Sequence, residues 1–523
     1  MLKAPKALRT TVIALALLLS MALAGCSGTS STGASSSTSS TSSTGGTLQL
    51  ANTLNAPSTY NPWGAGYGIN YSLWWSQALY DSLVTLDEKG TPQPSLAKSW
   101  KEDGKKLTLN LRDDVKFTDG TPVDSAAVKA NIDYAAAHPA GAECNNYLNG
   151  ATASADTTSV VTITLPQPFP GLLQDLGQCA GFIVNPKSLK NDSSLTSTPG
   201  GSGPYTLDSA NTLAGQKFTF VRNPKYWNKS AFPADKVVIT QYATNTAAIN
   251  AVQSGQSDLV SNLVNSDVKG IGSNVKVVAG QPNFFQGVWF IDTKGAVAKQ
   301  LGDVRVRQAM NYAIDRKAIN SALFGETGFA VASTPFAKFY QGYSNSLDDI
   351  YPYDVNKAKE LLKEAGYPNG FSVGIVVSPP TSQIASAMAG QLAKVGITLK
   401  ITSVSSNFIS EMQTGKYPMV SGAYTLNAAQ YQTIRGIVGP NGFWNPLHNS
   451  DPAVAALLDK ISTAKASDTE PLYQQLASTI AQKALLLAPV ISSQLKVYNP
   501  KKVTSQDTPG VGVPMLYNIK PVS

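Results

Sequence analysis

The first 46 residues of this 523-residue chain cannot contribute to a globular core, and this confines the fold to residues 47–523. Residues 3–9 carry three positive charges and precede an apolar run at 12–24. Thirteen residues span only ~20 Å as a helix, which is too short for a ~30 Å hydrocarbon layer. Residues 27–46 contain ten Ser, five Thr and four Gly, a composition typical of a flexible tether. We therefore expect a signal peptide at 1–25, a tether at 26–46 and a folded body after it.

The apolar run ends in Leu23-Ala24-Gly25-Cys26, which resembles a bacterial lipobox. Small residues suit the narrow site of a signal peptidase, and the Cys26 thiol supplies the sulfur for a diacylglyceryl thioether. Two or three acyl chains on one residue give stable membrane attachment. We predict that Cys26 is lipidated and that the body is held outside the cytoplasm, at the cell surface or in the periplasm. The alternative is a free cysteine beside an ordinary signal cleavage site.

Two further cysteines, Cys144 and Cys179, form an even pair. In an oxidising compartment such a pair predicts a disulfide, worth ~3–4 kcal/mol on the chain-entropy description. The alternative is two buried free thiols. The sequence contains no Cys-x-x-Cys, which argues against zinc-ribbon and thioredoxin-like folds.

Composition excludes several functions. The chain is 42% hydrophobic, enough for a large core, while only 14% of residues are charged against roughly 25% in ordinary soluble proteins. Removing the leader lowers the formal net charge from +8 to +5, which is weak evidence for a nucleic-acid partner. The two histidines, His138 and His448, read as exposed loop residues, so we expect no metal site and no cofactor.

Apolar periodicity predicts a mixed α/β architecture. Leucines alternate with polar residues at 107–111, as in a half-buried strand, and one face of residues 303–323 is apolar at helical spacing. A second amphipathic helix is expected at 354–365. Strands at 371–377 and 396–402 bracket a helical stretch, which gives a βαβ-like pattern.

Four blocks of sequence resemble the peptide/nickel class of solute-binding proteins, family 5, that serve ATP-binding-cassette (ABC) importers. They occur in the family's order and are highly specific together. They are Pro94–Trp100 leading into Leu109–Pro122, Gly201–Tyr205 with Arg222–Trp227, Asp303–Ala309 running to Arg316, and Lys357–Leu362 ending at Tyr367.

The resemblance implies an α/β, two-lobed, hinged fold of the periplasmic-binding-protein kind with an extra subdomain. Carried onto this chain, lobe one takes 47–80, 201–285 and 491–523, the extra subdomain 81–200, and lobe two 286–490. It further implies that the chain is not an enzyme. Instead it is expected to capture a small solute, most simply a peptide or peptide-like molecule, and to act as a monomer. The solute would pass to ABC permease subunits powered by a separate ATPase, because this chain has no Walker motif.

Aromatic residues in turn-rich stretches are the candidate ligand contacts, because clefts need wide apolar walls with a few polar groups. Each is as consistent with core packing as with a cleft. The candidates are Tyr60, Trp63, Phe285, Trp289, Tyr424, Asn427, Phe443 and Trp444.

One stretch departs from the family pattern. Peptide-binding relatives hold the ligand's amino terminus with an aspartate, but the corresponding residues 415–430 contain no carboxylate. A buried ammonium without a counter-charge is costly. Anchoring of a peptide through a free amine at this place is therefore doubtful. The missing carboxylate favours a solute that is neutral or is anchored in another way.

Two other functional classes fit less well. A secreted hydrolase would need a paired nucleophile and base. The Ser-x-x-Lys motif at 462–465 recurs at Ser95, Ser266 and Ser493 without its partner motifs, and Gly-x-Ser-x-Gly is absent. A lipid-tethered scaffold or adhesin would explain the anchor and tether but not the four blocks.

Overall fold

The computed structural model describes residues 45–64, 69–138, 148–325, 328–330, 334–404, 407–426, 429–508, 511 and 513–522. The chain divides into two units, Met1–Ser42 and Ser43–Ser523, and every described residue belongs to the second. The predicted signal peptide and Cys26 lie outside the described residues. Among the residues that are described, no helix is both long and apolar enough to cross a bilayer.

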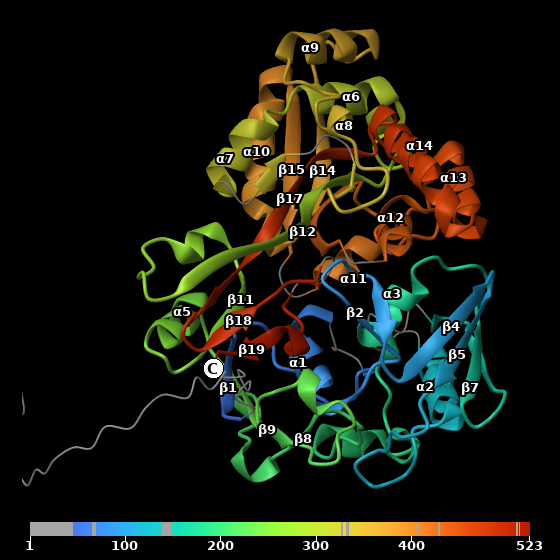
Figure 1. Ribbon diagram of the computed structural model, residues 1–523. Helices are drawn as coiled ribbons and strands as arrows, with labels where there is room; N and C mark the ends of the chain where they lie inside the picture. The colour runs from blue at the N-terminus through green and yellow to red at the C-terminus, as the bar shows by residue number, and fades with distance from the viewer. Residues whose placement is uncertain are drawn as a thin grey trace, which may run out of the picture. The chain divides into compact units, whose positions relative to one another are not determined.

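An eleven-stranded sheet runs through the fold in the order β15-β14-β16-β12-β17-β11-β1-β10-β9-β8, with β13 also paired to β17 (Figure 1). We call the part built on β1 and β8–β11 lobe one, and the part built on β14–β16 lobe two. The strands are β1 (Thr47–Asn52), β8 (Tyr205–Leu207), β9 (Lys217–Arg222), β10 (Lys236–Gln241), β11 (Leu259–Leu263), β12 (Lys276–Phe290), β13 (Gly328–Ala330), β14 (Phe371–Val377), β15 (Ile397–Ser403), β16 (Met419–Thr425) and β17 (Leu486–Tyr498).

Lobe one pairs β1 in parallel with both β10 and β11. Leu50 at its centre is fully buried, as a strand with neighbours on both sides requires. Helix α5 (Asn245–Gln253) starts where the Thr244 hydroxyl accepts a hydrogen bond from the Ala247 N–H at 3.1 Å. Helix α1 (Ile69–Leu79) and a C-terminal ribbon of β18 (Val503–Ser505) and β19 (Ile519–Pro521) complete this lobe.

A separate four-stranded sheet, β4-β5-β7-β6, forms within the range predicted as the extra subdomain. The predicted strand at 107–111 is confirmed: in β5 the three leucines are buried and the residues between them are not. The elements here are β2 (Val84–Leu86), β3 (Pro92–Pro94), β4 (Ala97–Asp103), β5 (Lys106–Leu111), α2 (Ser125–Ala137), β6 (Thr152–Ala155), β7 (Val160–Thr164), α3 (Leu172–Leu176) and α4 (Pro186–Leu189). The residue boundaries of the lobes and the subdomain stay a prediction.

Lobe two contains the predicted βαβ unit, because β14 and β15 pair in parallel around α10. The apolar face expected at 303–323 is buried, but the stretch forms two helices, α6 and α7. The break comes at Asp315, whose carboxylate caps the second helix by accepting from the Ala318 N–H at 2.9 Å. The helices are α6 (Val304–Tyr312), α7 (Arg316–Leu323), α8 (Asn345–Asp348), α9 (Val355–Glu364), α10 (Ser382–Leu392), α11 (Phe408–Gln413), α12 (Gln430–Val438), α13 (Pro452–Thr463) and α14 (Thr469–Gln482).

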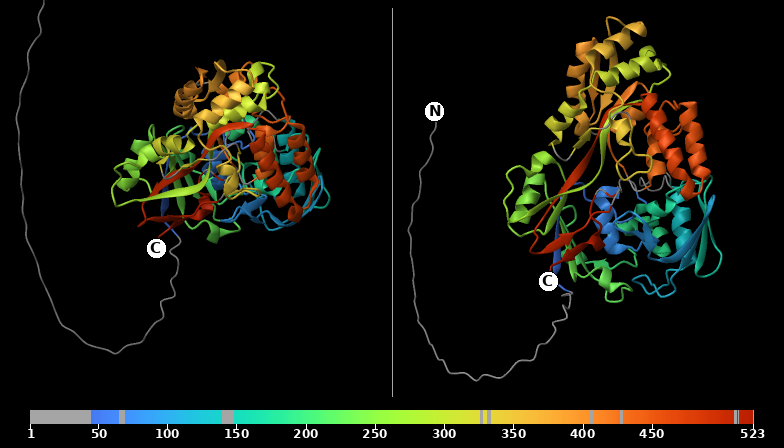
Figure 2. Two further views of the ribbon diagram at one scale, coloured as in Figure 1. Left: turned by 90° about the horizontal axis from the view of Figure 1, so that it is seen from above. Right: turned by 45° about the horizontal axis from the view of Figure 1, so that its top comes forward.

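Strands β12 and β17 link the lobes as one long antiparallel pair, visible in both views of Figure 2. In lobe one Lys276 lies opposite Tyr498, and in lobe two Trp289 lies opposite Leu486. Between these ends the register shifts on both sides of Pro282. Proline has no N–H to donate, so the pairing is weakest where the strands leave one lobe for the other. We call residues 280–283 and 492–494 the hinge segments.

Candidate ligand-binding site

An aromatic cluster forms in lobe two where β12 and β16 pair. The indoles of Trp289 and Trp444 stack with centroids 5.1 Å apart and planes 3° from parallel. Tyr424 and Phe443 meet Trp444 edge-on at 5.8 and 5.4 Å. Phe285 packs against Trp289 at 5.2 Å. We call these five residues the Trp444 cluster; the structure brings together five of the eight predicted contacts.

Gly422 explains how the two indoles stack so closely on β16. A Cβ at this position would lie 3.0 Å from Cζ3 of Trp289 and 3.3 Å from Cζ3 of Trp444. Both distances are shorter than ordinary van der Waals contact, so any side chain would push one ring away.

Exposure divides the Trp444 cluster into an inner and an outer part. Phe285, Trp289 and Trp444 are buried, whereas Phe443 is 47% exposed and Tyr424 is half-buried. The indole N–H groups of Trp289 and Trp444 are buried without a hydrogen-bond acceptor among the described residues. The inner rings are therefore core, and Phe443 and Tyr424 are the members with surface available to a ligand.

The extra subdomain contacts lobe two beside α12. Phe169 meets Tyr431 edge-on at 6.3 Å, and a Cβ built on Gly171 would lie 3.1 Å from the Ala429 Cβ. We call this contact between the extra subdomain and lobe two the rim beside α12.

A carboxylate lies close to this rim. Asp175 on α3 is 1% exposed. Burial holds the pKa of the Tyr340 phenol well above its usual range, and the charge of Asp175 adds to that effect. The Tyr340 hydroxyl donates to Thr433 Oγ1 at 3.2 Å. Sequence reasoning overlooked Asp175 because an aspartate within an apolar stretch carries no signal of what it faces.

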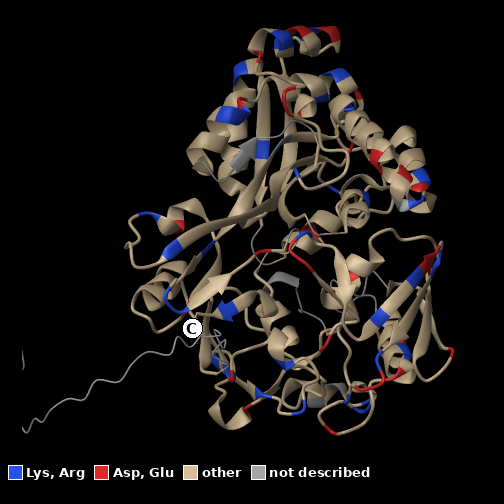
Figure 3. Cartoon of the chain, viewed as in Figure 1, with Lys and Arg blue, Asp and Glu red and all other residues tan. Residues whose placement is uncertain are grey.

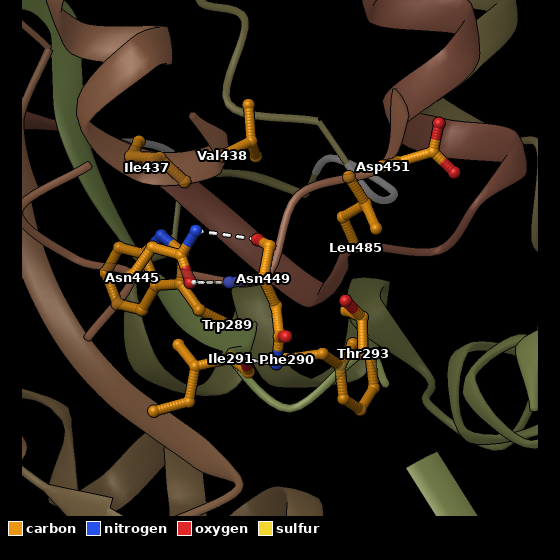
Figure 4. Close-up of a pocket in the computed structure, with 10 residues that line it drawn as sticks. All are labelled: Trp289, Phe290, Ile291, Thr293, Ile437, Val438, Asn445, Asn449, Asp451 and Leu485. Carbon is orange, nitrogen blue, oxygen red and sulfur yellow. Dashed lines mark hydrogen bonds between the residues drawn. The ribbon is translucent and has the colours of Figure 1, made fainter. Parts of the chain in front are cut away.

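A pocket behind the Trp444 cluster is built into lobe two itself (Figure 4). Asn445 and Asn449 cross it: Asn445 Nδ2 donates to the Asn449 carbonyl at 2.6 Å, and the Asn449 N–H donates to Asn445 Oδ1 at 3.2 Å. Asp451 at its edge caps α13 and pairs with Lys483 at 3.4 Å. These amides and this carboxylate already have partners, so the pocket supports the cluster from behind rather than offering a ligand site.

The two-lobed arrangement and the amino-acid sequence of the chain identify its family. A sequence model described as bacterial extracellular solute-binding proteins, family 5 (middle) matches residues 91–437. The chain belongs to this family. The glutathione-binding protein GsiB of Escherichia coli strain K12 is 30% identical over 377 residues, covering 70% of this chain and 71% of that protein.

Solved structures of other family 5 proteins show the same fold. The periplasmic binding protein AgaA of A. tumefaciens R10, in complex with agropinic acid, matches at 25% identity with a TM-score of 0.74, covering 91% of this chain and 99% of that one. The ABC-transporter-associated protein DppA of Helicobacter pylori, in complex with the peptide STSA, matches at 22% identity and a TM-score of 0.75, covering 92% and 98%. The predicted resemblance and the two-lobed fold class are confirmed. Because these relatives are substrate-binding proteins of ABC transporters, we conclude that the present chain is a binding protein and not an enzyme.

Two candidate contacts lie away from the Trp444 cluster, in the core of lobe one. Tyr60 is 6% exposed and meets Phe218 edge-on, and Trp63 donates its indole N–H to Asn131 Oδ1 at 3.1 Å.

Asn427 and Cys144 lie outside the described residues. Cys179 is buried and disulfide-bonded. Its pairing with Cys144 and the ligand roles of the candidates stay predictions.

Where the structure describes the chain, no group of three or more His, Cys, Asp or Glu is placed to hold a metal ion. In Figure 3 the positions of basic and acidic residues are interspersed along the ribbon. Arg305 and Arg307, at the start of α6, are structural: Arg305 pairs with Asp303 at 2.6 Å, and Arg307 donates to backbone carbonyls, the nearest being that of Leu301 at 2.6 Å.

Proposed function

We propose that this family 5 protein is the lipid-anchored receptor of an ABC importer. It captures a small solute, a peptide or peptide-like molecule, between its two lobes and delivers it to the permease. The observation that carries the proposal is the hinge: β12 and β17 join two lobes that each have their own core, and their pairing is interrupted between them. Ligand favours closure only through contacts made by both lobes at once.

The rim beside α12 supports closure around a ligand. Phe169 of the extra subdomain and Tyr431 of lobe two meet there, so the two parts are already in contact at this place. Tyr424 and Phe443 then offer aromatic surface on the lobe-two side, which suits a solute with an apolar or planar part.

A solute screen tests the receptor. Purified protein lacking residues 1–46 is heated with glutathione, with di- to tetrapeptides, and with sugars and metal chelates as comparison classes. A ligand that binds only the folded form raises the melting temperature in proportion to ln(1 + [L]/Kd). We expect a peptide or peptide-like compound to do so. A screen in which no class shifts the melting temperature contradicts the receptor, and a shift by sugars alone contradicts the peptide assignment.

Matched variants connect such a shift to the cleft. Tyr424→Ala removes a half-buried ring of the Trp444 cluster, and Tyr353→Ala removes a tyrosine that is 42% exposed on lobe two, outside that cluster. We expect the first to reduce the solute-induced shift and the second to leave it unchanged. Equal responses would place the solute elsewhere.

The anchor is tested separately, in cells. Cys26→Ser removes the thiol that the lipobox resemblance assigns to acylation, so we expect the full-length variant to leave the membrane fraction. Ser27→Ala, the neighbouring residue, is the control and should stay with the membrane. If Cys26→Ser still sediments with lipid, the anchoring proposal is wrong.

A further inference from the structure

The hinge contains a pocket that the Trp444 cluster does not use. It is small and open to solvent, and residues of both crossing strands line it. Gly280, Gln281 and Asn283 come from β12, Gln494 and Lys496 from β17. Ser261, Asn262 and Asp507 complete its polar lining.

The charged groups of this hinge pocket neutralise each other. Lys496 Nζ lies 2.7 Å from Asp507 Oδ1, and it also donates to the Ser505 carbonyl at 3.1 Å. The Lys496 side chain is 4% exposed and that of Asp507 is 22% exposed. A buried pair this close presents little net charge to a neighbour, so an ionic group entering the pocket would lose its hydration without a counter-charge.

Two amide oxygens of the pocket, by contrast, have no donor among the described residues. They belong to Asn262 and Gln494, and both are buried. Beside them lies Asn283, which is 3% exposed and whose backbone carbonyl accepts from the Leu426 N–H. Buried amide groups without hydrogen bonds are rare in proteins and call for an occupant.

Backbone conformation marks the same place. Asn262 adopts φ = 63°, a left-handed conformation that is uncommon for residues other than glycine, and the β11–β17 register shifts between Val260 and Leu263. Strain of this kind persists where the surrounding structure needs it, and it clusters at ligand sites.

We propose that the hinge pocket is a subsite for an uncharged hydrogen-bonding group of the solute, a carboxamide or a hydroxyl. This inference rests on the proposed function for the identity of its occupant as part of a transported solute. Its chemistry follows from the pocket alone: the buried amide oxygens of Asn262 and Gln494 accept hydrogen bonds and so call for an N–H or O–H donor, and the paired charges of Lys496 and Asp507 favour a neutral one. Because residues 280–283 and 494 belong to the hinge segments, a group bound here stabilises one arrangement of the crossing strands.

Small probes of equal size test the pocket without knowledge of the solute. Crystals of the protein are soaked separately in acetamide, sodium acetate and ethylammonium chloride at equal concentration. We expect density for acetamide within hydrogen-bond distance of Asn283 and Gln494, and none for the two ions. Equal occupancy by either ion, or only water in all three soaks, overturns the inference.

Two variants test whether the amide side chains of the pocket contact the bound probe. Gln494→Met preserves length and removes the amide, so acetamide should no longer be seen in the pocket. Asn283→Asp preserves shape and adds a carboxylate, so ethylammonium should now bind in place of acetamide. Failure of Asn283→Asp to change the preference would show that this side chain does not contact the occupant. These outcomes do not depend on the solute screen: a receptor with no probe in the pocket refutes the subsite alone, and a failed screen refutes the receptor alone.

Discussion

Gly422 is the residue on which the stacking of Trp289 and Trp444 depends. We predict that Gly422→Ala lowers the free energy of unfolding by about 1–3 kcal/mol, because the new methyl group overlaps both rings. Gly390→Ala is the control: this glycine lies in α10, and a methyl group added to it would have no atom within 4 Å, so the change should be neutral or stabilise by up to about 1 kcal/mol. Urea denaturation followed by tryptophan fluorescence measures both. Equal effects at the two positions would contradict the packing argument.

Asp81 joins lobe one to the extra subdomain. Its carboxylate accepts hydrogen bonds from the Tyr226 hydroxyl at 2.7 Å and from the Ser202 hydroxyl at 2.8 Å. Arg112 of the subdomain stacks on Trp227, whose indole N–H also points at Asp81. Burial raises the pKa of Asp81 to about 6 despite these hydrogen bonds.

The raised pKa predicts a pH dependence of stability. The folded form binds this proton more tightly than the unfolded chain, whose aspartate titrates near 3.8. The resulting stabilisation is complete below about pH 3.8 and is lost as the pH rises through 6. We therefore expect wild type to gain stability relative to Asp81→Asn between pH 7 and pH 4, by up to roughly 3 kcal/mol. Urea unfolding of both proteins at several pH values measures the difference, and parallel pH profiles would show that Asp81 does not titrate in this range.

Local sequence patterns predicted individual helices and strands correctly, but they did not predict where one helix ends and the next begins. The strand at 371–377 and the helix ending before Gly366 follow from periodicity and a glycine stop, and both are confirmed. The break between α6 and α7 was missed because the apolar face continues across it. Only the cap at Asp315 divides the two helices, and an aspartate inside an amphipathic stretch is as compatible with an exposed helical position.

The hinge segments give a prediction about β12 and β17. Amides at 280–283 should exchange with solvent faster than those at 284–290, because the β12–β17 register shifts on both sides of Pro282, whereas all residues of 284–290 pair with β16 and most pair with β17 as well, across one further shift between Gln286 and Val288. Hydrogen–deuterium exchange of the intact protein, read by mass spectrometry, resolves these peptides. Addition of the solute found in the screen should slow exchange at the hinge segments. Uniformly slow exchange along β12 would argue against a hinge there.

For the molecule as a whole, the sequence predicted that the site is aromatic but not which of the aromatic residues come together. Phe285, Trp289 and Tyr424 come together because β12 and β16 pair in one register, and the loop after α12 adds Phe443 and Trp444; no local pattern specifies either arrangement. Tyr60 and Trp63 are also aromatic residues in a turn-rich stretch, yet they pack into the core of lobe one. The hinge pocket is invisible in the sequence for the same reason, since Gln494 on β17 is distant along the chain from Asn262 on β11 and Asn283 on β12.

Closure of the two lobes around a solute leads to a final prediction, at the rim beside α12. The edge-on contact of Phe169 with Tyr431 joins the extra subdomain to lobe two, and such pairs contribute ~0.5–1.5 kcal/mol. Phe169→Ala should therefore speed release of the bound solute by about 2- to 10-fold and change its association rate little. Stopped-flow fluorescence with the solute from the screen measures both rates. Leu213→Ala, at a residue of lobe one that is 55% exposed, is the control and should leave release unchanged. Release from Phe169→Ala at the wild-type rate would mean that the bound solute is retained by contacts other than this rim.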